Sequence, residues 1–489
     1  MLFNSLEFLI FFPVVTLLYF IIPHKFRWFL LLTASCIFYM FFIWQYVFIL
    51  LVTILIDYFA GMLIEKESGK RRKIYLIVSI ISTCLVLFVF KYFNFFNANF
   101  EYIAGLLHWN YPVEALNIIL PIGLSFHTFQ SLSYVIEVYR GRQKAEKHFG
   151  IYALYVMFYP QLVAGPIERP QNLLHQFYEK HEVDFKRIGD GLKLMLWGFF
   201  KKVVIADRLA ILVNSIYDSP EGHSGPQFII ATVFFAIQIF CDFSGYSDIA
   251  IGSAQVMGFK LMDNFRRPYF SGSVAEFWKR WHISLSTWFK DYLYISMGGN
   301  RVSKPRWYFN LFLTFLISGL WHGSNWTFVI WGALNGFYLI VSIWTKGIRQ
   351  KIVKAVKLDR VPLLHGLLQI TVTFALVCFA WIFFRARDVS KAIYIITHMF
   401  TGLSEGFGSM ESLLSETGMG INGFIIAVGC IVFMEAVHIV QQKRGSIRQM
   451  VASKPLLVRW ACYYTLLLVI ILLGIYGSTA PSAFIYFQF

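Results

Sequence analysis

Charged residues are scarce in this sequence: Asp, Glu, Lys and Arg together make up 14% of its 489 residues. Hydrophobic residues make up 57%, aromatic residues 19%, and the mean hydropathy is +0.60. This composition excludes a large soluble protein. Apolar runs close to the roughly 20 residues that cross a bilayer recur along nearly the whole chain. We therefore expect a single polytopic membrane domain over residues 1–489.

Cysteine is also sparse and shows no paired spacing. The six cysteines stand singly inside apolar runs, at Cys36, Cys84, Cys241, Cys378, Cys430 and Cys462. Neither a disulfide framework nor a zinc cluster is indicated, and we expect no metal. Internal repeats and low-complexity linkers are absent. The first apolar run, 8–22, lacks a basic flank and a cleavage site, so we interpret it as a retained span.

Basic residues outnumber acidic ones, 43 to 27, but they lie in short loops between apolar runs. This placement is typical of membrane topology, and we expect no nucleic-acid partner. The basic loops beginning at Glu65, Arg140, Lys346 and Gln441 should face the cytoplasm, which places both termini outside. The predicted spans outside the middle of the chain are 8–22, 29–44, 46–64, 74–96, 116–139, 361–384, 421–440 and 455–476.

The middle of the chain, about 149–345, has short apolar runs interrupted by Gly, Pro and polar residues. Such backbone at membrane depth must be buried in protein or line a wet cavity, so we place the catalytic core here. The N-terminal spans occupy 1–140 and the C-terminal spans 361–489. The run 149–166, which carries Pro160, is either a re-entrant hairpin or a span.

The segment from Ser273 to Tyr294 predicts an amphipathic helix. Ser273 and Glu276 have the spacing of a capping box. An aromatic and aliphatic stripe follows at three- and four-residue steps, formed by Trp278, Trp281, Leu285, Trp288 and Tyr292. His282 lies at the edge of this stripe, either as a structural residue of an interfacial helix or as a functional one.

His322 lies in a second polar interruption, "LWHGSNW", between two apolar runs. About twelve residues from Phe309 lift the chain only about 18 Å, so the turn should lie beyond the middle of a layer about 30 Å thick. An ionisable residue at that depth is expensive, and we interpret His322 as functional. The alternative is a buried histidine that joins two helices.

Two further segments carry polar groups inside apolar runs. Asp242 and Asp248 in "CDFSGYSDIA" are too far around a straight helix to form an acid–base pair, unless Gly245 bends it. We expect them to hold partners such as a histidine nitrogen, a helix N-terminus, or Arg266 and Arg267. The run from Pro121 carries His127 and Gln130, which could line a cavity or join helices by hydrogen bonds.

A deep histidine could ligate a metal, relay protons in a transporter, or act as a general base on a hydroxyl. Metal binding is disfavoured because His282 and His322 lack HxxxH or HExxH spacing. A transporter would usually show two related halves, which are absent here. Acyl transfer fits a histidine at a deep turn with basic and aromatic surroundings on the cytoplasmic side.

The motifs "WHISLSTWFKDYLY", "SGLWHGSNWTFVIWGALNG", "DFSGYSDIAIG", "FQSLSYVIEVYRG", "AGPIERP" and "FIYFQF" resemble the membrane-bound O-acyltransferase family, in its bacterial alginate O-acetyltransferase branch. The resemblance covers most of the chain. It implies an all-α polytopic fold of about 10–12 transmembrane helices, with re-entrant and amphipathic helices around a central funnel. It also implies that His322 is catalytic and that His282 is a second active-site residue.

The implied activity is transfer of an acetyl group from a cytoplasmic thioester, acetyl-CoA or an acyl carrier protein, for O-acetylation of an extracytoplasmic polysaccharide. The implied setting is the inner membrane and its lipid, with an extracytoplasmic acetyltransferase as partner and no bound cofactor. The residues expected to line or support the funnel are Asp242, Asp248, Trp321, Asn325, Trp278 and Gln130. The basic residues expected on the donor side are Lys279, Arg280, Arg301 and Lys304. Three alternatives remain: D-alanyl transfer to teichoic acid, transport of a polysaccharide or lipid, and a scaffold role in an export complex.

Overall fold

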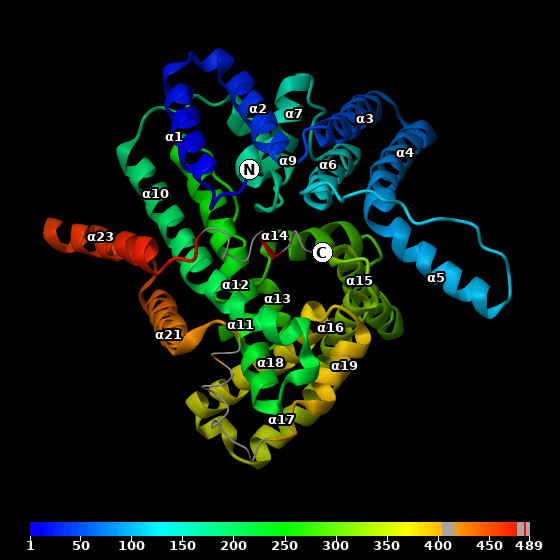
Figure 1. The fold of residues 1–489 in the computed structure, drawn as a ribbon. Coiled ribbons are helices and arrows are strands. Elements are labelled where there is room, and N and C mark those ends of the chain that lie inside the picture. Colours follow the sequence, from blue (N-terminus) through cyan, green and yellow to red (C-terminus); the bar gives the residue numbers. More distant parts are fainter. Residues whose placement is uncertain (403–413, 415–416, 477–483, 486–489) are drawn as a thin grey trace. The chain divides into compact units, whose positions relative to one another are not determined.

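The computed structural model describes residues 1–402, 414, 417–476 and 484–485. These residues form helices, turns and irregular segments, and no strand occurs among them (Figure 1). The chain divides into two compact units, Met1–Met195 with Ile249–Met262, and Leu196–Asp248 with Asp263–Phe489. Helices α10 (Phe185–Phe199) and α12 (Gly225–Met257) continue across the division. The all-helical architecture confirms the predicted fold class.

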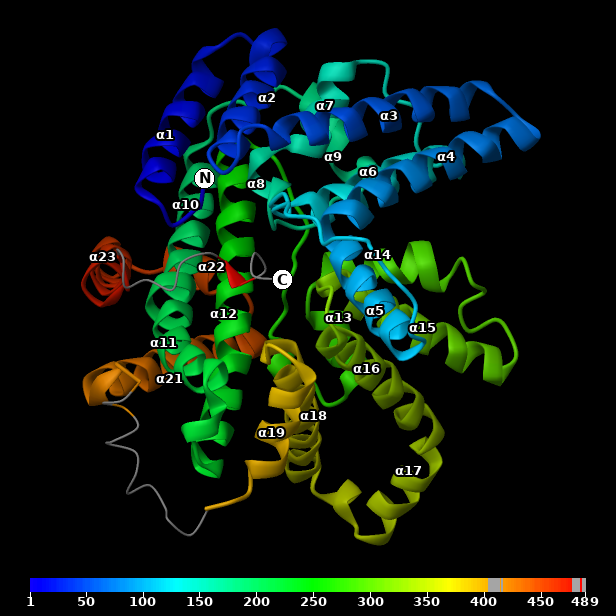
Figure 2. The same ribbon diagram turned by 45° about the vertical axis from the view of Figure 1, so that its right-hand side comes forward.

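The first unit contains most of the N-terminal half of the chain. Its helices are α1 (Leu6–Ile21), α2 (His24–Met40), α3 (Tyr46–Lys66), α4 (Gly69–Leu87), α5 (Phe93–Leu106), α6 (Leu124–Tyr139), α7 (Phe149–Met157), α8 (Tyr159–Leu162) and α9 (Pro170–Leu173). α3, α4 and α6 lie side by side (Figure 2). The predicted span over 116–139 was wrong at its start. α6 begins only at Leu124, because Gly123 before it has a left-handed φ of 78° and cannot continue a helix backwards.

The second unit contains the C-terminal spans and most of the predicted catalytic core, whose residues 149–195 and 249–262 lie in the first unit. Its helices are α11 (Asp207–Asp218), α12, α13 (Val274–Arg280), α14 (Ile283–Trp288), α15 (Lys304–His322), α16 (Trp326–Trp344), α17 (Lys346–Ala355), α18 (Pro362–Arg385), α19 (Val389–His398), α21 (Gly420–Arg444), α22 (Ile447–Ala452) and α23 (Leu456–Leu473). Three π-helical segments join neighbouring helices, at Phe88–Tyr92 in the first unit, at Phe200–Ala206 and at Phe289–Tyr294. Short 3₁₀ turns occupy Leu174–Tyr178, Pro220–Gly222, Pro268–Phe270 and Leu358–Arg360.

Seven helices among the described residues are long and apolar enough to cross a membrane. They are Tyr46–Lys66, Gly69–Leu106, Gly225–Met257, Trp326–Trp344, Pro362–Arg385, Gly420–Arg444 and Leu456–Leu473. α1 is apolar but shorter, at 16 residues. The chain is therefore a multi-pass membrane protein.

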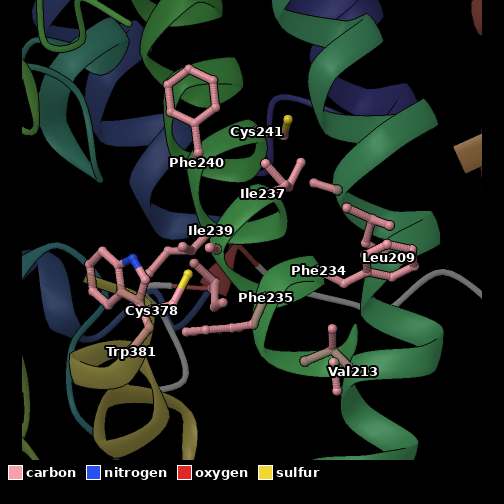
Figure 3. Packing of buried hydrophobic residues seen from close by; sticks show 14 of the residues in the cluster. Leu209, Val213, Phe234, Phe235, Ile237, Ile239, Phe240, Cys241, Cys378 and Trp381 are labelled. Atoms are coloured by element: carbon pink, nitrogen blue, oxygen red, sulfur yellow. The ribbon is translucent and has the colours of Figure 1, made fainter. Parts of the chain in front are cut away.

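α12 is the central helix of the second unit's core. In its most apolar stretch 78% of the residues are buried, which explains why it is apolar all round rather than on one face. Side chains of α12 pack against side chains of α11 and α18 in this core, among them Leu209, Phe235 and Trp381 (Figure 3). This core supports the loop and the helices that carry the two histidines.

α15 and α16 form a tight antiparallel hairpin, which fixes the turn that contains His322. The helices meet at glycines: a Cβ on Gly319 would collide with the Phe328 carbonyl oxygen, and one on Gly332 with the Phe315 carbonyl oxygen. Small residues at such positions allow helix backbones to approach closely. The hairpin therefore depends on two glycines that helix propensity alone would disfavour.

The run 149–166 contains two short helices, α7 and α8. The nine residues of α7 rise only about 14 Å, too little to cross a bilayer, which favours the re-entrant alternative. The motif "AGPIERP" follows, and its Glu168 is buried. The Glu168 carboxylate accepts hydrogen bonds from the Met262 amide (2.5 Å) and the Asn172 side chain (3.4 Å), which tie this segment to the loop after α12.

Candidate active site

His322 is the last residue of α15 and is buried. The helix begins at Lys304 rather than near Phe309, so it lifts His322 about 28 Å from the basic turn rather than the predicted 18 Å. The imidazole lies against aromatic rings, with centroid distances of 4.8 Å to Trp321, 4.9 Å to Trp331 and 5.3 Å to Phe384. These contacts fix the ring at the closed end of the hairpin.

The turn after His322 is set by its glycine and asparagine. A Cβ on Gly323 would collide with the Phe328 ring, so only glycine fits there. The Asn325 side chain then caps α16, because its oxygen accepts the Thr327 amide at 3.1 Å. Asn325 also donates to the Arg387 carbonyl oxygen at 2.8 Å. The predicted site residue Asn325 thus shapes the turn beside His322.

His282 lies between α13 and α14, and here the predicted continuous helix was wrong. His282 has left-handed dihedral angles, φ 43° and ψ 56°, which break the helix after Arg280. Its buried ring lies 4.5 Å from Phe243 and 6.2 Å from Trp321. Trp321 therefore contacts both histidines, and the structure brings His282, Trp321 and His322 together in one aromatic cluster.

The left-handed turn at His282 is held by the segment after α12. The Ile283 amide donates to the Asn264 carbonyl oxygen and the Arg266 amide to the Arg280 carbonyl oxygen, both at 2.9 Å. The buried Asn264 side chain accepts from the Ser284 amide (3.3 Å) and hydroxyl (2.9 Å). It also donates to the Ser247 hydroxyl at 3.2 Å. A non-glycine residue in this conformation costs about 1–2 kcal/mol, which these bonds offset.

The capping box at the start of α13 is only half formed. The Ser273 hydroxyl accepts the Glu276 amide at 3.2 Å, as predicted. The Glu276 carboxylate, however, accepts the Gly272 amide (2.9 Å) and pairs with Arg280 (2.5 Å) rather than reaching back to the Ser273 amide. The helix is short because the turn at His282 ends it after seven residues.

An aromatic wall surrounds the two histidines. The Trp278 ring lies 5.6 Å from the Trp331 ring, and Trp331 in turn contacts His322. The indole N–H of Trp278 donates to the Asn335 side chain at 3.2 Å. Trp278 is thus linked to His322 through Trp331, and its supporting role stays a prediction. Burial lowers the pKa of His282 well below its ordinary value, because water no longer stabilises the charged ring. A neutral imidazole is the form that can accept a proton.

A cavity of about 480 Å³ opens beside the turn that follows His322. It is lined by Asn214, Asp218, Gly323, Ser324, Asn325, Phe328, Arg385, Ala386 and Arg387. Asp218 pairs with both arginines, at 3.2 Å to Arg385 and 3.4 Å to Arg387. None of these charged residues was predicted from the sequence. The run "FFRARD" at the end of an apolar span was the only available signal for the two arginines.

Asp242 and Asp248 have lysine partners. α12 runs straight through Gly245, and the two carboxylates bind different residues: Asp242 pairs with Lys202 at 2.5 Å and Asp248 with Lys201 at 2.8 Å. The predicted pairing with Arg266 or Arg267 was wrong. Arg266 instead pairs with Asp263 and Arg267 binds Gln442. The sequence signal that was overlooked is the pair of adjacent lysines in "FFKKVVIA". Burying two charged side chains inside an apolar run costs free energy unless they have acidic partners.

Gln130 belongs to the first unit. It lies on α6, and its buried amide donates to the Tyr155 carbonyl oxygen, a contact that joins α6 to α7. The nearby His127 contacts the Thr53 hydroxyl at 2.6 Å. Both polar residues thus have hydrogen-bond partners on neighbouring helices, and a funnel-lining role for Gln130 stays a prediction.

The four predicted donor-side basic residues lie on either side of the π-helical segment that follows α14. Lys279, Arg301 and Lys304 are exposed, and Arg280 is half-buried in its pair with Glu276. Two accessible cationic side chains, Arg301 and Lys304, therefore lie at the start of α15, and the third, Lys279, lies on α13. Among the residues that the structure describes, no three His, Cys, Asp or Glu side chains gather where they could hold a metal ion.

Comparison with known proteins places this site in a family. Residues 146–383, which include both histidines, match the model of the membrane-bound O-acyltransferase family. The chain is 39% identical to the probable alginate O-acetylase AlgI of Pseudomonas aeruginosa, over 88% of this chain and 81% of the relative. It is 35% identical to the peptidoglycan O-acetyltransferase of Helicobacter pylori, over 76% and 73% of the two chains. It is 28% identical to the teichoic acid D-alanyltransferase of Bacillus subtilis, over 55% and 70%. The chain belongs to the membrane-bound O-acyltransferase family.

Proposed function

We propose that this membrane O-acyltransferase moves an acetyl group from a cytoplasmic thioester to a hydroxyl group at the outer face, for O-acetylation of an extracytoplasmic polysaccharide. The observation that carries the proposal is the placement of His322. It lies at the closed end of the α15–α16 hairpin, in an aromatic cluster with His282, and next to an open polar cavity.

The proposed orientation follows from charge. Basic loops face the cytoplasm under the positive-inside rule, which assigns the exposed Lys279, Arg301 and Lys304 to the donor side of the inner membrane. Since α15 runs about 28 Å from Lys304 to His322, the cavity beside His322 then belongs to the acceptor side. Both termini lie outside in this orientation.

The donor is proposed to be acetyl-CoA or an acetylated acyl carrier protein, with no resident cofactor. Both donors carry phosphate groups, which exposed Lys and Arg side chains attract. The acetyl thioester then has to reach His322 past the aromatic wall formed by Trp278, Trp321 and Trp331, where exclusion of water strengthens electrostatic contacts.

The proposed chemistry is acyl transfer with a histidine base. The imidazole of His322, as general base, accepts the proton of the acceptor hydroxyl as the hydroxyl oxygen attacks the thioester carbonyl. The carbon–oxygen bond forms, the carbon–sulfur bond breaks, and the thiolate leaves and takes up a proton. His282, held by its left-handed turn, orients the carbonyl or stabilises the developing oxyanion.

The acceptor is proposed to be a hydroxyl of a cell-surface polymer or of an extracytoplasmic acetyltransferase that passes the group on. Acetyl is favoured over D-alanyl because the relatives named for O-acetylation reach 35–39% identity over most of the chain. The relative named for D-alanyl transfer is 28% identical over 55% of the chain. Membrane lipid surrounds the protein in either case.

The test uses inside-out membrane vesicles that contain the protein, so that its proposed cytoplasmic face is accessible. Acetyl-CoA labelled in the acetyl group is added outside, and label is measured on hydroxyl-bearing material inside the vesicle. Label that accumulates inside with acetyl-CoA, but not when D-alanyl carrier protein replaces it, supports the proposal. Label with the D-alanyl donor alone would assign the alternative activity, and equal label in right-side-out vesicles would contradict the orientation.

A further inference from the structure

The C-terminal residues Phe484 and Ile485 are buried in the core of the second unit. They expose 2% and 4% of their surface. The Ile485 amide donates a hydrogen bond of 2.7 Å to the Asp242 carboxylate of α12. A backbone group near the end of the chain is thus bound by a carboxylate on the central helix.

Asp242 is itself fixed by a buried charge cluster. One of its oxygens pairs with the Lys202 ammonium at 2.5 Å, and Lys202 also pairs with Asp207 at 2.8 Å. All three side chains are buried. Such a cluster contributes little net stability, but it holds each charged group in one orientation. Asp242 therefore presents its second oxygen to the Ile485 amide in a fixed direction.

Phe484 connects this anchor to the candidate active site. Its ring lies 4.7 Å from Tyr246 and 5.4 Å from Phe243. Phe243 in turn lies 4.5 Å from His282, edge to face. The contacts therefore run from the charge cluster through Ile485 and Phe484 to Phe243, which contacts His282.

We propose that Asp242 is a positioning residue, which binds the Ile485 amide and so holds Phe484 against the aromatic support of His282. Phe484 and Ile485 are then part of the packing that supports His282. If these two residues are released, Phe243 loses one of the rings that pack against it, and His282 loses its fixed position. The activity part of this inference rests on the proposed acetyl transfer, and the structural part does not.

The decisive variant is Ile485→Pro. Proline has no amide hydrogen, and its ring carbon would project from the nitrogen toward the Asp242 oxygen and clash with it, so the anchor is removed while the charge cluster stays intact. Ile485→Val keeps the amide and is the matched control. Asp242→Asn is the second variant, because its single oxygen cannot serve Lys202 and Ile485 together.

The first readout follows the C-terminal residues directly. A Phe484→Cys thiol is labelled with a membrane-permeant maleimide, and mass spectrometry separates it from the six native cysteines. In the Ile485→Pro background labelling should be about tenfold faster or more, the scale on which a hydrogen bond to a charged group shifts a local equilibrium. In the Ile485→Val and Asp248→Asn backgrounds the thiol should stay protected, because neither change touches the anchor.

The second readout is acetyl transfer from labelled acetyl-CoA at matched protein levels. Ile485→Pro should lower kcat about tenfold or more and leave KM for the donor nearly unchanged, and Ile485→Val should match the intact protein. Protection of the thiol in Ile485→Pro, or full transfer by that variant, would overturn the inference. If the intact protein transfers no acetyl while the thiol is still released by proline, the anchor stands and the proposed function fails.

Discussion

Replacement of Asn264 by alanine should uncouple activity from folding more sharply than any other change away from the histidines. The substitution removes the two hydrogen bonds that the side chain accepts from Ser284 and the one that it donates to Ser247. At about 1 kcal/mol net for each bond, the loss is about 3 kcal/mol. That exceeds the about 1–2 kcal/mol that the left-handed turn at His282 costs, so the turn should relax.

Catalysis should fall even in the Asn264→Ala molecules that remain folded. A displacement of about 1 Å at a catalytic group can lower a rate about 100-fold, so kcat of Asn264→Ala should fall between about tenfold and 100-fold. The assay is acetyl transfer at matched levels of folded protein, with thermal unfolding in detergent measured in parallel. Asn264→Asp keeps an acceptor oxygen for the Ser284 amide and hydroxyl and loses only the donor to Ser247, so its rate should be intermediate.

Asn310 provides a matched control in the same unit. It is buried like Asn264, and its side chain donates to the Met297 and Gly299 carbonyl oxygens, both at 3.1 Å. Asn310→Ala should therefore cost a comparable amount of stability while each folded molecule keeps its rate. Equal rates per folded molecule for the two alanine variants would refute the proposed link between Asn264 and His282.

Three further predictions concern stability. The free energy of unfolding of His282→Gly should exceed that of His282→Ala by about 1 kcal/mol, because glycine adopts φ 43° without strain. His282→Gly should therefore unfold at a higher temperature. Gly332→Ala should destabilise the protein by about 1–3 kcal/mol, because its Cβ meets the Phe315 carbonyl oxygen, whereas Gly429→Ala meets nothing within 4 Å and should be neutral or slightly stabilising. Burial raises the pKa of Glu168 from 4.5 to about 7. A raised carboxyl pKa contributes stability that is present below pH 4.5 and is lost as pH rises through 7. The free energy of unfolding of Glu168→Gln should therefore rise relative to that of the intact protein, by up to about 3 kcal/mol, between pH 5 and pH 8.

For each of these three predictions, one experimental outcome would contradict the reasoning. Equal melting temperatures for the glycine and alanine variants at 282 would show that the left-handed turn is not strained. Unchanged stability of Gly332→Ala beside Gly429→Ala would contradict the close approach of α15 and α16. A melting-temperature difference between Glu168→Gln and the intact protein that does not grow from pH 5 to pH 8 would show that the carboxyl group does not titrate in this range.

The turn at His322 was predictable from local signals. Gly323, Ser324 and Asn325 interrupt two apolar runs, and an asparagine before an apolar run is a standard helix cap, which the structure confirms at Asn325. The length of the helix before the turn was underestimated, because α15 begins at Lys304, within a segment that is polar and basic. Pattern reading places helix ends poorly when polar residues extend the helix.

The break at His282 was not predictable from its own segment. The aromatic stripe continues across it with helical spacing, so every local signal favours one helix. The left-handed turn exists because Asn264 and Arg266, which lie elsewhere in the sequence, bind the backbone on both sides of it. A tertiary contact of this kind overrides periodicity, and a single sequence carries no record of it.

The prediction of the partners of Asp242 was wrong for a related reason. Arginines near the end of the same segment were chosen because they were close in sequence, whereas Lys201 and Lys202 reach α12 from the π-helical segment before α11. The useful signal was energetic. Two adjacent lysines inside an apolar run require buried carboxylates, and few carboxylates stand inside apolar runs of this chain.

The measurement that bears most directly on His322 is the rate of acetyl transfer from labelled acetyl-CoA in vesicles that contain either the intact protein or His322→Ala, at matched levels of inserted protein. A general base contributes about 100- to 10,000-fold, so label should accumulate with the intact protein and fall to background with the alanine variant. Equal rates of labelling in the two preparations would remove His322 from the chemistry and leave it as a residue that joins α15 to α16.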